Sequence, residues 1–162
     1  MKWIAAIVFS IVIVASFVTI NKNAAPEDKD KAPEVDVNER IRFSHVKVFI
    51  DSKQWPLAAY QFDMSIKRGK VKFVGIAGGE HAAFKEPPYY DPKFMTGERA
   101  VIAAFSMHAK DRLPTGKTAV AFIQVQVTGL EQPLYEIKLD VAATTNGKKI
   151  PAEISIEQGI EK

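Results

Sequence analysis

Residues 118–128 have the sequence TAVAFIQVQVT, and this stretch decides the fold because it holds the longest two-residue periodicity in the chain. Apolar residues occupy every second position from Ala119 to Val127, whereas Gln124 and Gln126 fall on the opposite side. Successive side chains of a β-strand point to opposite faces of a sheet. The stretch therefore predicts a long strand with one face in a core and the other toward solvent.

Other segments on both sides of this strand show the same alternation of apolar and polar residues. In residues 100–107 nearly every residue is apolar, which is consistent with a strand buried on both faces. No segment of helical length after residue 40 has apolar residues at a 3.6-residue spacing. The pattern predicts an all-β fold, an antiparallel β-sandwich or jelly roll. The predicted strands are 45–50, 59–66, 71–74, 100–107, 118–128, 135–141 and 150–157.

The dipeptide Asn146-Gly147 separates the last two predicted strands. Both central positions of a type I′ turn need a positive φ, which asparagine and glycine tolerate better than other residues. We therefore predict a tight hairpin that joins residues 135–141 to residues 150–157.

An almost unbroken apolar run, WIAAIVFSIVIVASFVTI, occupies residues 3–20. Its 18 residues carry no charge. A helix of that length rises about 27 Å, close to the ~30 Å hydrocarbon core of a bilayer. The run predicts an N-terminal transmembrane helix that acts as a signal-anchor in the cytoplasmic membrane. The alternative is a cleaved signal peptide with candidate sites at residues 14–16 or 23–25, followed by secretion. Both hypotheses place the C-terminal domain in the periplasm or outside the cell.

Two changes of composition divide the chain into three parts. After the apolar segment 1–20, residues 21–39 hold two prolines, charges of both signs and almost no large apolar residue. Such a segment cannot bury enough surface to fold, so we predict a flexible, disordered linker. Residues 40–158 then have the usual length of one domain. Because the chain has no cysteine, packing and not disulfide bonds must stabilise this domain.

Three stretches of the predicted domain resemble the cohesin-type domain, within the wider group of sandwiches like carbohydrate-binding modules. The first is HVKVFIDSKQWPLAAYQFDMSI, residues 45–66, whose Tyr-Gln-Phe-Asp sequence is similar to the family's aromatic-Gln-Phe-Asp strand. The others are VKFVGIAGGE, residues 71–80, and RLPTGKTAVAFIQVQVTG, residues 112–129, which are similar in their strand patterns. The chain departs from the family in residues 78–97, a long loop rich in proline and tyrosine. The resemblance implies a nine-stranded jelly roll that binds another protein through one sheet face, and it does not imply an enzyme.

Candidate binding residues come from the segment GGEHAAFKEPPYYDP, residues 78–92, and from the connection that contains a tryptophan. Loops on a rigid sandwich often carry binding, and aromatic rings stack on sugars or anchor protein contacts. The alternative is structural, with the rings of residues 78–92 folded back as a lid and the tryptophan plugging the end of the core. The candidates are Trp55, Phe84, Tyr89, Tyr90 and Asp91.

No pattern in the sequence is typical of an enzyme, a cofactor site or a nucleic-acid surface. The histidines, His45, His81 and His108, lack the spacing of metal ligands. Most aspartates in the predicted loops are explained by the preference of aspartate for turns. The sequence does not decide whether the domain binds calcium. After residue 20 the chain has 21 Lys and Arg against 19 Asp and Glu, which gives no reason to expect nucleic acid as a partner.

We therefore expect a membrane-anchored, extracytoplasmic and non-catalytic module that binds a protein of the cell envelope. Docking would use a sheet face or residues 78–92. The alternative is carbohydrate binding, with Trp55, Tyr89 and Tyr90 as stacking platforms for a polysaccharide. Exposed coplanar rings would favour the carbohydrate, and rings buried under the loop would favour the protein.

Overall fold

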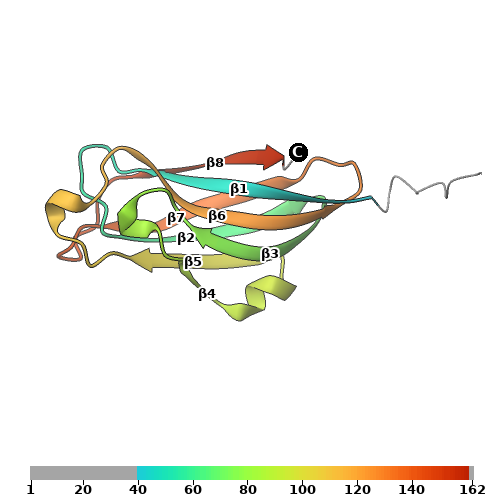
Figure 1. Ribbon diagram of the computed structural model, residues 1–162, viewed down its shortest axis with the longest axis horizontal. Helices are drawn as coiled ribbons and strands as arrows, with labels where there is room; N and C mark the ends of the chain where they lie inside the picture. The colour runs from blue at the N-terminus through green and yellow to red at the C-terminus, as the bar shows by residue number, and fades with distance from the viewer. Residues whose placement is uncertain (1–39, 161–162) are drawn as a thin grey trace, which may run out of the picture. The chain divides into compact units, whose positions relative to one another are not determined.

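Two four-stranded sheets share one core within residues 40–160, the part of the chain that a computed structural model describes (Figure 1). The predicted transmembrane segment, residues 1–20, and the predicted linker, residues 21–39, lie outside the described residues. Within residues 40–160, no helix combines the length and the apolar character needed to cross a bilayer.

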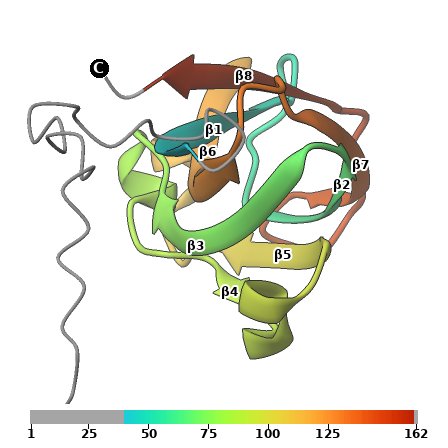
Figure 2. The ribbon, with the colours of Figure 1, turned by 90° about the vertical axis from the view of Figure 1, so that its right-hand side faces the viewer.

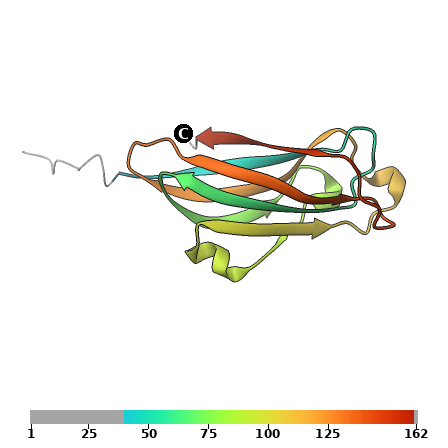
Figure 3. The same ribbon diagram turned by 180° about the vertical axis from the view of Figure 1, so that it is seen from behind.

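The sheets are named A and B, with strand orders β3-β6-β1-β8 and β4-β5-β2-β7. Sheet A contains β1 (Ile41–Asp51), β3 (Lys70–Gly78), β6 (Lys117–Thr128) and β8 (Glu153–Ile160). Sheet B contains β2 (Ala59–Arg68), β4 (Tyr89–Tyr90), β5 (Arg99–Phe105) and β7 (Leu134–Ala143). Figure 3 shows β7, β2 and β5 side by side. All neighbouring strands are antiparallel, so the predicted antiparallel β-sandwich is confirmed, with eight strands in the described residues.

The alternation along β6 determines which of its side chains enter the core. Ile123 pairs with Val46 of β1 and with Ile76 of β3, and all three pack inward from sheet A. Its neighbour Gln124 is exposed on the outer face. Complete burial stabilises the fold by roughly 1.5–3 kcal/mol for each large apolar side chain. The largest fully buried side chains include Phe62, Phe73, Phe94, Ile50, Leu57, Met64, Ile102 and Ile123.

The connection between β7 and β8 corrects the hairpin predicted at Asn146-Gly147. The two strands belong to different sheets, so they form no common ladder. Gly147 has a positive φ of 76° but Asn146 does not, whereas a type I′ turn needs both. The Gly147 amide donates to the Thr144 carbonyl at 2.9 Å, and the Asn146 side-chain oxygen accepts from the Thr144 hydroxyl. The dipeptide thus lies in a short antiparallel reversal, closed by an isolated bridge between Ala143 and Lys149, after which the chain crosses to sheet A.

Strand β5 corrects a second prediction, because only one of its faces is buried. Ala100 and Ile102 point into the core, whereas the side chains of Val101 and Phe105 are 39% and 58% exposed. A nearly continuous apolar sequence does not distinguish a strand buried on both faces from one whose outer face is bare.

The residues between β3 and β5 fold into defined turns around the short strand β4. These turns are the 3-10 helices η1 (Ala82–Phe84) and η2 (Pro92–Thr96), and a third, η3 (Lys110–Arg112), follows β5. Phe94 of η2 is buried and stacks on Phe73 of β3, with ring centroids 4.4 Å apart. At Gly79, a Cβ atom would lie 2.0 Å from the carbonyl oxygen of Ala119, so glycine permits a close approach to β6. The segment is therefore packed against the sandwich.

The two ends of the sandwich carry different connections. At the basal end, seen face-on in Figure 2, β1 begins, β2 turns into β3 and β6 connects to β7, over residues 40–43, 67–72 and 129–134. A hydrogen bond of 2.8 Å from the Gly129 amide to the Arg40 carbonyl ties two of these segments together. The distal end consists of residues 51–58, 106–116 and 144–149.

Replacing Phe94 by alanine tests whether η2 belongs to the core. We expect the free energy of unfolding to fall by about 3–5 kcal/mol, because the buried ring loses its contacts and leaves a cavity. The matched control is Phe105→Ala at an exposed position, which should change it by less than ~1 kcal/mol. Urea unfolding followed by circular dichroism measures both values. Equal effects of the two substitutions would contradict the packing described here.

Candidate binding site on the outer face of sheet B

The segment 78–92 divides its aromatic residues between the core and the surface. Phe84, a predicted binding residue, is buried, and its ring meets the ring of Tyr60 edge-on with centroids 5.1 Å apart. The amide of Ala83 donates to Nδ1 of His81, which caps this turn. Phe84 therefore acts as core and offers no surface to a partner in this conformation.

Tyr90 and Asp91, two further predicted binding residues, support the turn η2. The half-exposed ring of Tyr90 meets Phe94 edge-on with centroids 5.4 Å apart. Asp91 precedes η2, and its Oδ1 accepts a hydrogen bond of 2.9 Å from the Lys93 amide. A side-chain cap of this kind satisfies an amide that the turn leaves free. The geometry gives Asp91 the turn-forming role that its sequence context also allows.

Tyr89 is the most exposed aromatic residue of this segment, and β4 places it on the outer face of sheet B. It pairs with Ala103 of β5. Its ring is 67% exposed and lies parallel to the ring of Phe105, with centroids 6.0 Å apart and planes 5° from parallel. Val101, also exposed, lies on the same face two residues from Ala103. We call Tyr89, Val101 and Phe105 the aromatic patch.

Two prolines limit the strand that carries Tyr89. Pro87 and Pro88 precede β4 directly, and proline has no backbone N–H to donate to a ladder. This explains why β4 has two residues and pairs with β5 only through Tyr89 and Tyr90. Pro88 is buried, so the entry to β4 is held by packing as well as by the fixed φ of proline.

The rest of the same face carries ion pairs. Arg99 of β5 donates to the carboxylate of Asp63 on β2 through Nε at 2.7 Å and through Nη2. Lys67 and Glu136 form a second pair at 2.6 Å. These residues surround an open hollow of about 530 Å³ beside the apolar part of the face. Asp63 pairs in register with Val101, so the ion pairs adjoin the aromatic patch.

Trp55 lies apart from the aromatic patch, at the distal end. Its half-exposed ring lines a hollow of about 210 Å³ together with Lys110 and residues 144–148. The loop is held by a hydrogen bond of 3.0 Å from the Trp55 amide to the Ser52 carbonyl. Among the ring contacts of the described residues, none joins Trp55, Tyr89 and Tyr90 to one another. Of the three rings predicted as sugar platforms, Trp55 lies at the distal end, whereas Tyr89 and Tyr90 are consecutive in β4 and contact different rings, Phe105 and Phe94.

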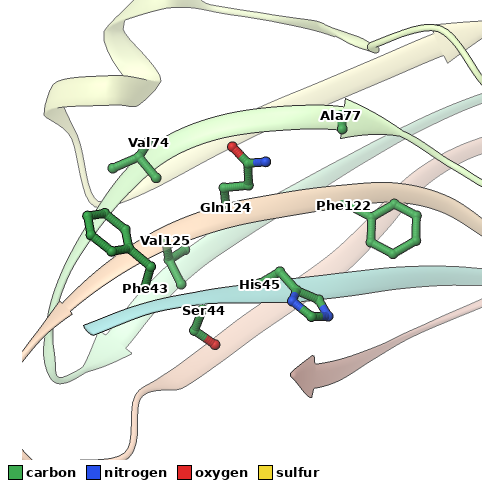
Figure 4. Close-up of a pocket in the computed structure, with 8 residues that line it drawn as sticks. All are labelled: Phe43, Ser44, His45, Val74, Ala77, Phe122, Gln124 and Val125. Atoms are coloured by element: carbon green, nitrogen blue, oxygen red, sulfur yellow. The ribbon is translucent and has the colours of Figure 1, made fainter. Parts of the chain in front are cut away.

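The outer face of sheet A has a hollow of its own, of about 460 Å³ (Figure 4). Phe43 and Val74 stand at one side of it, and His45 and Phe122 stand at the other, with their ring centroids 6.3 Å apart. A Cβ atom at Gly159 would lie 2.3 Å from Nε2 of His45, so the imidazole covers the backbone of β8. The sequence does not reveal this hollow, because its walls come from three strands distant in sequence.

The histidines and acidic residues of residues 40–160 do not converge. No group of three His, Asp or Glu side chains in this range lies close enough to hold a metal ion. His108 is hydrogen-bonded to Ser106 at 3.0 Å, His81 caps η1, and His45 covers Gly159. Each histidine therefore takes part in local packing.

Comparison of the chain with family models, with curated proteins and with solved structures finds no match. The aromatic patch, the hollow on sheet A and the hollow beside Trp55 are the surface features that bear on function.

The ion pair between Asp63 and Arg99 predicts that the stability of the fold depends on pH. Hydrogen bonding from Arg99 lowers the pKa of Asp63 below its usual 3.8, although the carboxylate is only 17% exposed and burial opposes the shift. The pair therefore stabilises the fold fully above the unfolded-state pKa, and the stabilisation is lost as pH falls through the lowered folded-state pKa.

A double-mutant cycle of Asp63→Asn and Arg99→Gln measures this coupling through the free energy of unfolding. We expect a coupling of up to about 1 kcal/mol at neutral pH, since Arg99 is well exposed. The coupling should disappear as pH falls through the lowered folded-state pKa of Asp63, where its carboxylate becomes protonated. A coupling of the same size at neutral and acidic pH would contradict the assignment.

Proposed function

We propose that this chain is a non-catalytic binding module of the cell envelope that docks a partner protein on the outer face of sheet B. Residues 3–20 tether it to the cytoplasmic membrane or direct its secretion, and the sandwich lies outside the cytoplasm. The proposed protein docking agrees with the resemblance to cohesin-type domains, which implies binding through one sheet face.

The exposed, parallel rings of Tyr89 and Phe105 alone would also suit a sugar, so the observation that carries the proposal is their continuation into exposed Val101, which makes the surface apolar and not hydrogen-bonding. Contiguous exposed apolar groups on a soluble domain are typical of interaction sites. Tyrosine is also enriched among residues that contribute most to the affinity of protein interfaces.

The setting of the aromatic patch suits a protein interface in two further respects. First, Tyr89 and Phe105 lie on paired strands, so little conformational entropy is lost when they are covered. Second, the ion pairs of Asp63 and Arg99 border the patch on one side. An apolar centre with a polar rim is the usual anatomy of an interface.

Carbohydrate binding is the second candidate, and the hollow beside Trp55 is the observation that favours it. An indole next to Lys110 and the polar side chains of residues 144–148 combines a stacking surface with hydrogen-bonding groups. Tyr89 and Tyr90 do not extend this surface, because neither lines the hollow beside Trp55. A sugar site would therefore be small and centred on Trp55.

Capture of a partner from envelope extract by the tagged chain tests the proposed function. We expect the double variant Tyr89→Ala/Phe105→Ala to weaken retention of the partner by about 30- to 1000-fold, because each of the two buried anchors contributes roughly 1–2 kcal/mol. Phe43→Ala, an exposed aromatic on sheet A, is the matched control and should bind normally.

The opposite result, in which Phe43→Ala loses the partner and the double variant keeps it, would place docking on sheet A and reject the proposal. A polysaccharide screen with Trp55→Ala tests the second candidate. If a polysaccharide binds and this substitution leaves its affinity unchanged, the sugar site does not lie at Trp55.

A further inference from the structure

Four exposed apolar side chains gather at the basal end. The described residues expose ten large hydrophobic side chains, and Ile41, Phe43, Leu130 and Leu134 all belong to this end. Ile41 pairs with Thr128, two residues before Leu130, and Leu134 pairs with the last residue of β2. The four side chains therefore come from both sheets and from the loop between them. Such a collection differs from single exposed hydrophobics, which need no explanation.

Positive charge accompanies these apolar groups. The three basal segments 40–43, 67–72 and 129–134 contain six Lys and Arg residues and one carboxylate, Glu131. Glu131 is already engaged, because its Oε1 lies 3.2 Å from Nε of Arg68. Lys70 and Lys72 project from the same side of β3, and neither forms an ion pair within residues 40–160. The basal end thus offers free cations beside exposed leucines.

The basal end is also where the chain continues toward its apolar N-terminal run. Arg40 leads directly into β1, and 19 residues separate residue 20 from Arg40. The composition of residues 21–39 predicts a linker, and a random-coil linker of that length would have a root-mean-square span of about 25 Å. If residues 3–20 anchor the protein, as the proposed function holds, the tether keeps this end at a high effective concentration next to lipid headgroups.

We infer that the basal end binds the anionic phosphate headgroups of the membrane that anchors the chain. Lys70 and Lys72 pair with the phosphates, while Leu130 and Leu134 rest at the boundary of the acyl chains. Surfaces that combine cationic and apolar side chains bind anionic bilayers by this combination of forces. An acidic protein could also pair with the lysines. The proposed tether, however, brings lipid and not such a protein to this end. The inference rests on the anchoring part of the proposed function.

Fluorescence quenching in lipid nanodiscs tests this inference with the full chain. The chain has no cysteine, so Gln132→Cys and Thr145→Cys each accept one fluorophore, at the basal and the distal end respectively. Strand β1 has 11 residues, and at about 3.3 Å per residue the two ends lie roughly 36 Å apart. Discs of phosphatidylcholine are compared with discs that also contain phosphatidylglycerol, both with a headgroup quencher. We expect strong quenching at position 132 in the anionic discs and little at position 145.

Charge reversal supplies the matched comparison. Lys70→Glu/Lys72→Glu should reduce the ratio of docked to undocked chain in anionic discs by about tenfold or more. Lys148→Glu/Lys149→Glu makes the same change of charge at exposed distal positions and should leave quenching at position 132 unchanged. High salt should act like the basal reversal, because it shortens the range of the attraction. Circular dichroism checks that both variants fold.

Equal quenching at the two positions, or quenching independent of anionic lipid and of the basal lysines, overturns the inference. So does a response of position 132 to added polyglutamate but not to anionic lipid, which would indicate an acidic protein as the ligand. A chain that does not elute with the discs overturns the anchor and this inference together. Partner capture through Tyr89 and Phe105 is measured separately, so it can persist when lipid contact fails.

Discussion

The structure depends on β6, a central strand of sheet A that is hydrogen-bonded to a neighbour on each side. Its inward-facing side chains form part of the core. Its ladder with β1 covers eleven residue pairs, and its ladder with β3 covers eight. Ile123, Val125 and Val127 are buried under these ladders and face sheet B. Because β3 meets sheet A only through β6, loss of this strand would also release the residues that β3 leads into. Of the aromatic patch, only Tyr89 follows β3 along the chain, whereas Val101 and Phe105 belong to β5, which pairs with β2.

Sequence periodicity predicts those elements whose two faces differ in polarity. It predicted β6, β2 and most of β7, since each alternates between core and solvent. It did not predict β4, because two residues provide no period and the strand exists through contacts with β5. The bend at Gly147 was assigned to the wrong turn type because sheet membership depends on tertiary packing, which local propensity does not contain.

The candidate site was predictable in part, for the same physical reason. Tyr89 was a candidate from its aromatic ring and its neighbouring prolines, and it is exposed. Its partner Phe105 was missed because the apolar sequence of β5 hides which face is bare. The sequence around Phe84 does not indicate that its ring is buried, since the ring that covers it, Tyr60, lies 24 positions earlier in the sequence. Side chains that meet across sheets are visible only after the strands have been paired.

Exposed sheet edges can pair with strands of other molecules. The prolines before β4 limit such pairing along one border of sheet B. A backbone without N–H groups at Pro87 and Pro88 gives a neighbouring molecule few sites for continuing the ladder beside β5. Two adjacent imino acids thus protect this border of sheet B against extension of its ladder by a strand of another molecule.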